Sequence, residues 1–91
     1  MLDIKKARDI LRVDGTDNDE IIQGLLSAIP RHIELVTGLA WHQQQVEPLV
    51  DTAAGFLLKL WYNAEQAETE KLQRTIDGLM KTITLIARSR E

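Results

Sequence analysis

The sequence predicts an all-α protein, a small bundle of three main helices plus one short N-terminal helix, in a single domain spanning residues 1–91. Apolar residues recur at helical spacing in four segments, and no segment shows the alternation of a half-buried strand. Turn and capping residues stand where these segments end. A chain of 91 residues without cysteine has one small core and no disulfide to support it.

The first segment predicts a short helix from Asp3 to Leu11. Asp3 suits the N-cap position, because its carboxylate can accept a hydrogen bond from a free backbone N–H of the first turn. The helix is expected to stop at residues 12–15, RVDG, since Asp-Gly favours a turn.

The second segment predicts a helix from Asn18 to Thr37. Asp17 and Glu20 have the spacing of a capping box, and Gly38 suits the left-handed position that follows a helix. Pro30 removes one backbone hydrogen bond and predicts a kink or a break. The apolar pattern continues beyond the proline, which favours a kink.

The third helix is expected from Pro48 to Ala64, after a polar connection over residues 39–47 that Trp41 anchors. Its apolar residues fill an arc of roughly 200°, whereas a helix on the surface of a small domain needs only about 100°. This surplus predicts cover from two sides. The second helix would supply one cover, and either the fourth helix or a neighbouring chain would supply the other. The predicted core anchors of the second and third helices are Ile22, Leu25, Leu26, Ile29, Ile33, Leu57, Leu60 and Trp61.

The last segment, residues 69–91, predicts an amphipathic helix from Thr69 to Ala87. Its apolar residues form a heptad-like seam, which is typical of helices that pack along one another. We therefore expect this seam and one side of the third helix to form an oligomer interface, with packing inside the same chain as the alternative. The predicted interface residues are Val50, Ala54, Leu58, Leu72, Ile76, Leu79 and Ile83.

No pattern in the sequence favours catalysis, and neither a cofactor nor a metal site is expected. His32 and His42 lie ten residues apart without a metal-binding pattern, and the acidic run at residues 14–20 fails the ligand spacing of a calcium loop. The net charge is −3, and the second helix opens with acids that would repel DNA. No apolar run approaches the roughly 20 residues that span a membrane, and no small-molecule substrate is indicated.

Several short strings occur in a characteristic order. They are residues 11–14 (LRVD), 19–22 (DEII), 37–38 (TG) and 61–63 (WYN). Over residues 2–65 this order resembles the head–tail connector, or adaptor, proteins of long-tailed phages and their prophage relatives. The amphipathic helix after Glu68 departs from the family pattern, as does Pro30 within the second helix.

The resemblance implies an all-helical structural protein without a reaction or cofactor. Such proteins form a ring below the portal of the filled capsid, extend the DNA channel and dock a stopper or tail-completion protein. The expected location is the head–tail junction of the virion, and the host bacterial cytoplasm during assembly. Genomic DNA would pass without sequence-specific binding. Two alternatives remain: a homo-oligomeric helical interaction module, such as a dimeric adaptor, and a small DNA-binding regulator.

Overall fold

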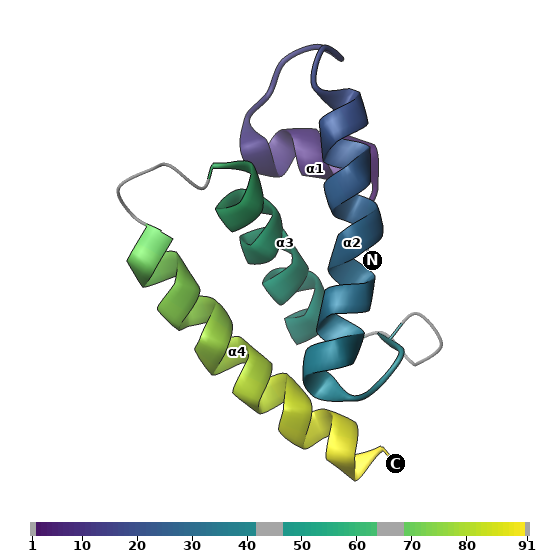
Figure 1. The fold of residues 1–91 in the computed structure, drawn as a ribbon, viewed down its shortest axis with the longest axis vertical. Coiled ribbons are helices and arrows are strands. Elements are labelled where there is room, and N and C mark those ends of the chain that lie inside the picture. The colour runs from purple at the N-terminus through teal and green to yellow at the C-terminus, as the bar shows by residue number, and fades with distance from the viewer. Residues whose placement is uncertain (1, 42–46, 64–68, 91) are drawn as a thin grey trace.

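The computed structural model describes residues 2–41, 47–63 and 69–90, and these residues form helices and no strand (Figure 1). The predicted all-α fold class is therefore confirmed. The four helices are α1 (Ile4–Leu11), α2 (Asp19–Thr37), α3 (Pro48–Tyr62) and α4 (Thr69–Ser89). The short α1 lies across one end of α2 and α3, and α4 runs along α3 (Figure 1).

The ends of α1 follow the sequence prediction. The Asp3 carboxylate accepts a hydrogen bond of 2.8 Å from the backbone N–H of Lys6, which caps the helix. At the other end Arg12 adopts a left-handed conformation with φ of 57°, and its N–H returns to the carbonyls of Arg8 and Asp9. This cap reverses the chain into the turn that leads to α2.

The start of α2 differs from the predicted capping box. The N-cap residue is Asn18 and not Asp17, and it makes no side-chain cap. Its amide instead donates a hydrogen bond of 2.7 Å to the Tyr62 hydroxyl, which ties the start of α2 to the end of α3. The backbone N–H of Asp19 donates to the Thr16 carbonyl at 3.1 Å, and Asp19 and Glu20 place negative charge at the positive end of the helix dipole.

The predicted end of α2 is confirmed, and Pro30 does not break the helix. Gly38 has a positive φ of 84°, which glycine adopts at little cost, and its N–H donates to the Glu34 carbonyl at 2.8 Å. The helix continues through Pro30 as one element from Asp19 to Thr37. Packing of the apolar face on both sides of the proline offsets the missing hydrogen bond.

Trp41 anchors the chain after α2, as the sequence predicts. Its side chain is buried, and its indole N–H donates a hydrogen bond of 2.9 Å to the Thr37 hydroxyl. That hydroxyl donates in turn to the Ile33 carbonyl at 2.7 Å, so both buried polar groups are satisfied. The Arg90 guanidinium lies 5.1 Å from the Trp41 ring centroid and 3.5 Å from the Glu47 carboxylate. The C-terminal end of α4 is thereby fixed against the start of α3.

Helix α3 is the centre of the fold. It packs against each of the other three helices, which explains why it is apolar over so wide an arc. Of the two covers that the sequence leaves open, the fourth helix is the one observed, and α1, α2 and α4 of the same chain cover α3 without a partner chain. The predicted last residue, Ala64, and the expected frayed end at residues 65–68 lie outside the described residues.

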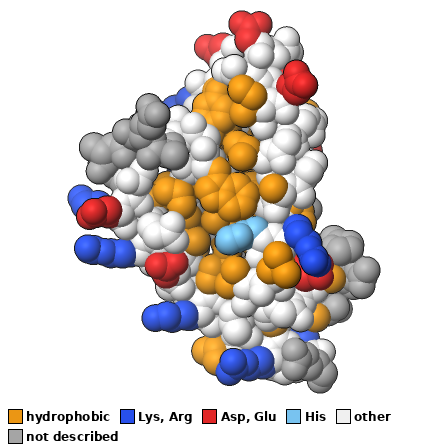
Figure 2. Space-filling view, viewed as in Figure 1, with side chains coloured by type: hydrophobic (Ala, Val, Ile, Leu, Met, Phe, Trp, Pro, Cys, Tyr) orange, Lys and Arg blue, Asp and Glu red, His pale blue; other side chains and the backbone are white. Residues whose placement is uncertain are grey.

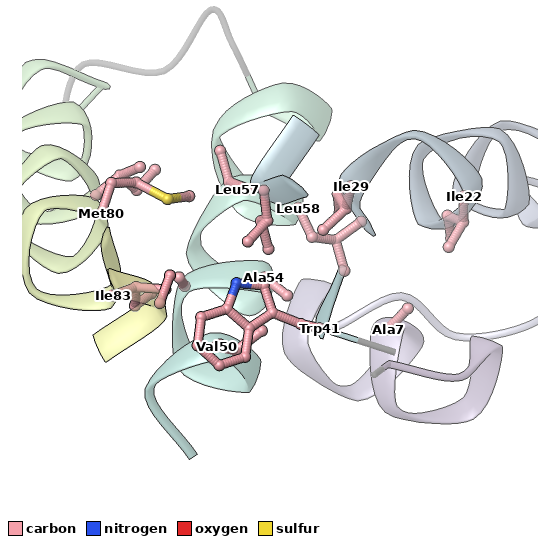
Figure 3. Close-up of a cluster of buried hydrophobic side chains, with 14 residues drawn as sticks. Ala7, Ile22, Ile29, Trp41, Val50, Ala54, Leu57, Leu58, Met80 and Ile83 are labelled. Atoms are coloured by element: carbon pink, nitrogen blue, oxygen red, sulfur yellow. The ribbon is translucent and has the colours of Figure 1, made fainter. Parts of the chain in front are cut away.

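The core lies where α3 meets α2 and α4. Figure 3 shows side chains of α3, including Leu57 and Leu58, between Ile29 of α2 and Met80 and Ile83 of α4. Four predicted anchors are buried, and the other four are half-buried and pack against the cluster. The buried anchors are Ile22, Ile29, Ile33 and Leu57, and the half-buried ones are Leu25, Leu26, Leu60 and Trp61.

The predicted oligomer interface is mostly core. Five of its residues are buried within the chain, and the other two are half-buried against the same cluster. The buried residues are Val50, Ala54, Leu58, Ile76 and Ile83, and the half-buried ones are Leu72 and Leu79. The physical reason is that the seam of α4 packs on its own α3. Heptad spacing indicates that a helix has a partner but does not say whether that partner belongs to the same chain.

Candidate interaction surfaces

The described residues do not converge on a catalytic or metal-binding centre. They hold no group of three or more His, Cys, Asp or Glu that could bind a metal ion. The ring of His32 packs edge-on against Trp61, with centroids 5.2 Å apart and planes at 81°. His42 lies outside the described residues. None of the helices in the described ranges combines the length and apolar character of a membrane-crossing segment.

Large apolar side chains remain exposed on α2 and α4. Within the described ranges these are Ile21, Leu35, Val36 and Leu85, which are 62%, 67%, 45% and 64% exposed. None of them belongs to the interface set predicted from the sequence. Ile21, Leu35 and Leu85 each stand beside or two residues from a core-facing residue, and helical periodicity assigns that residue to the core instead. Val36 continues the period of Ile29 and Ile33, which predicts it on the same apolar face, but it is exposed near the end of the helix.

The exposed side of α2 carries an apolar stripe of its own. Ile21, Leu25, Ala28, His32 and Leu35 follow one another at steps of 4, 3, 4 and 3 residues, and each is exposed or half-buried. The stripe runs for about 21 Å along the helix axis. In Figure 2 hydrophobic side chains surround the described histidine on this face. Leu25 packs against the core and His32 against Trp61, so the exposed members Ile21, Ala28 and Leu35 are the ones on which another helix can pack.

A pocket of about 340 Å³ lies between the C-terminal halves of α2 and α4. Its wall is largely apolar, and its charged residues are the cations Lys81 and Arg88. The lining residues are Val36, Met80, Lys81, Thr84, Leu85 and Arg88. We call this the basic pocket. Two of the exposed apolar side chains, Val36 and Leu85, line it, so it has the apolar centre and charged rim of a small interface.

The opposite end of α2 is acidic. Asp17 and Glu20 are exposed beside Ile21, and within the described ranges neither carboxylate has an ion pair or side-chain hydrogen bond. We call Asp17, Glu20 and Ile21 the acidic end. Figure 2 shows the same separation, with acidic side chains at one tip of the molecule and basic ones toward the other. The acidic end and the basic pocket therefore lie toward opposite ends of α2.

Asp19 differs from these two acids because it is already paired within the chain. Arg8 of α1 donates to the Asp19 carboxylate through both Nε and Nη2, with an Nε–Oδ1 distance of 2.9 Å. The hydrogen bond from Arg8, aided by the charge of the guanidinium, holds the pKa of Asp19 below its usual value. Asp19 thus joins α1 to α2, while Asp17 and Glu20 remain available to another molecule.

A larger hollow of about 690 Å³ lies between the end of α1, the end of α3 and the start of α4. Cations also face it, namely Arg12, Lys59 and Lys71. None of the four exposed large hydrophobics lines this hollow. Half-buried apolar side chains such as Phe56 and Leu72 also line it, but its wall is more polar than apolar, whereas the wall of the basic pocket is largely apolar.

Comparison with family models, with curated proteins and with solved structures gives no match to this chain. Its function has to be inferred from its own residues. They offer a rigid helical body, an exposed apolar stripe, an acidic end and a basic pocket.

Proposed function

We propose that this protein is a structural subunit of a phage head–tail connector. In this role several copies form a ring below the portal, extend the channel through which the genome passes and present a docking surface to a stopper or tail-completion protein. The chain acts at the head–tail junction of the virion and is made in the cytoplasm of the host bacterium. No reaction and no cofactor form part of the proposal.

The observation that carries the proposal is the set of large apolar side chains left exposed around a core that is already closed. The seam of α4 and the wide apolar face of α3 are buried inside the chain. The side chains of Ile21, Leu35, Val36 and Leu85 nevertheless remain exposed to solvent. Exposed apolar patches rimmed by polar residues mark interaction sites. Together with the resemblance over residues 2–65, this supports a protein whose purpose is assembly.

The arrangement of these residues suits a ring. Neighbours in a ring meet through two different surfaces, since a head-to-tail contact that closes by rotation is heterologous. Ile21 lies at the start of α2, and Leu35 and Val36 lie near its end, so one helix carries apolar residues to two separate places. A self-complementary dimer needs only one such place.

The net charge of −3 also suits a channel that DNA must slide through, because a predominantly acidic wall repels phosphate and does not hold it. A lumen lined mainly by Lys and Arg would contradict this part of the proposal.

The test is electron microscopy of the protein mixed with the portal protein of the genome that encodes it, with portal alone as the control. We expect a ring of added density on the tail-facing side of the portal. Portal particles that gain no density would contradict the connector function. A stable species of two chains that leaves the portal unchanged would support the dimeric adaptor in its place.

A further inference from the structure

We infer that the acidic end of one copy docks into the basic pocket of the next copy. The inference rests on the proposed function and deepens it, because it names the two surfaces that form the contact between ring neighbours. The occupant of the basic pocket is then a second copy of this chain, presenting Ile21 with Asp17 and Glu20.

The apolar part of the contact is the first argument. Ile21 is the exposed large hydrophobic of the acidic end, and it stands at the start of a helix where a neighbour can reach it. The basic pocket has an apolar wall that includes Val36 and Leu85, and at about 340 Å³ it has room for an aliphatic side chain. Docking would cover Ile21, Val36 and Leu85 together, and Leu35, which does not line the pocket, would lie at the edge of the contact between the two copies.

The charges supply the second argument. Asp17 and Glu20 flank Ile21, while Lys81 and Arg88 stand on the rim of the pocket. Within the described part of the chain none of these four side chains has an internal partner. Opposite charges on the two surfaces select the mixed contact, because two acidic ends or two basic pockets would repel each other.

The contact has a direction, and this determines the form of the assembly. Each copy gives its acidic end to one neighbour and receives the acidic end of another in its pocket. Such a heterologous contact produces a closed ring if the rotation between copies closes, and an open filament if it does not. The larger hollow near α1 is a poorer receptor for an aliphatic side chain, since its wall is mainly polar.

The test reverses the charges on each surface separately. One variant carries Asp17→Lys and Glu20→Lys, and the other carries Lys81→Glu and Arg88→Glu. Each variant alone is expected to self-associate at least about tenfold more weakly than the wild type in sedimentation velocity at low salt. Both variants should remain folded because all four side chains are exposed, and circular dichroism and urea titration check this.

The decisive step is to mix the two variants. The lysine-bearing end of the first variant now matches the glutamate-bearing pocket of the second, and the unchanged surfaces also match. We therefore expect the mixture to recover wild-type assembly, as should a single chain with all four substitutions. A control variant, Lys71→Glu with Arg74→Glu, changes the net charge as the pocket variant does, at two exposed positions in the first half of α4, and should assemble normally.

Three results would overturn the inferred contact. They are assembly of either two-site variant at wild-type strength, failure of the mixture to recover, and a wild type that stays monomeric both alone and beside the portal. The proposed function is tested separately by the portal density. Density that persists in both charge variants would overturn the contact and leave the connector function standing. Charge-dependent assembly without portal density would contradict the connector function and leave the contact standing.

Discussion

Replacing Ile83 by alanine tests whether α4 belongs to the core of the single chain. Ile83 is 0% exposed and lies between α4 and α3, whereas Leu85 on the same helix is 64% exposed (Figure 3). Truncating a buried Ile costs the transfer free energy of the removed atoms and leaves a cavity, and the total is about 2–5 kcal/mol. The matched control, Leu85→Ala, should change the free energy of unfolding by no more than about 0.5 kcal/mol.

Urea unfolding followed by circular dichroism and tryptophan fluorescence measures the free energy of unfolding of both variants, and thermal unfolding measures their Tm. In a domain of this size 1 kcal/mol shifts Tm by about 4–8 °C, so Ile83→Ala should lower Tm by at least about 8 °C. The loss should not depend on protein concentration, because the cavity forms inside one chain. An Ile83→Ala protein with wild-type stability but weaker self-association would refute this reasoning and return the α4 seam to the oligomer interface.

Three further substitutions test other parts of the fold. Thr37→Val removes the acceptor of the Trp41 indole N–H and should cost about 1–3 kcal/mol in urea unfolding, because a buried donor is left unsatisfied; an unchanged midpoint would contradict this. The hydrogen bond from Arg8 is the main reason why the pKa of Asp19 is lower in the folded protein than its usual value of 3.8. The ionised Asp19 therefore stabilises the fold fully above pH 3.8, and this stabilisation is lost as the pH falls through the lowered pKa. The difference in the free energy of unfolding between wild type and Asp19→Asn should therefore be constant near neutral pH and shrink below about pH 4. A difference that grows on acidification would contradict a lowered pKa of Asp19. Ile76→Asp places a carboxylate at a position that is 2% exposed and should unfold the chain at pH 7, as circular dichroism would show; a folded monomer that only fails to assemble would contradict the burial of Ile76.

The sequence was sufficient to predict the helices because their ends carry strong local signals. Asp3 caps α1, Pro48 opens α3 with Glu47 before it, and Gly38 ends α2 in a left-handed conformation. Each of these depends on contacts within a few residues. The start of α2 was missed by one residue, because the competing partner of Asn18 is Tyr62, which is 44 positions away in the chain.

The interface could not be predicted in the same way. The sequence pattern of a seam such as that of Ile76 and Ile83 is the same whether the helix packs on its own α3 or on another molecule. Periodicity therefore identifies the apolar face of a helix but does not identify what covers it. The exposed residues that now define the candidate surfaces, such as Ile21 and Leu85, lie off the core-facing period. Only the three-dimensional arrangement shows that they are uncovered and that opposite charges surround them.

Cross-linking across the inferred contact tests most directly whether copies join through two different surfaces. The chain has no cysteine of its own, so Gly24→Cys near the acidic end and Thr84→Cys in the basic pocket can be introduced together without interference. A Cβ at Gly24 meets no atom within 4 Å beyond the neighbouring backbone of its own helix. A control chain carries Gly24→Cys with Gln73→Cys, and Gln73 is exposed on α4 outside the pocket. After treatment with a short bismaleimide, we predict a ladder of dimers, trimers and larger products from the first chain and monomers from the control. Dimers without larger products would mean a self-complementary pair, and that result would contradict the ring.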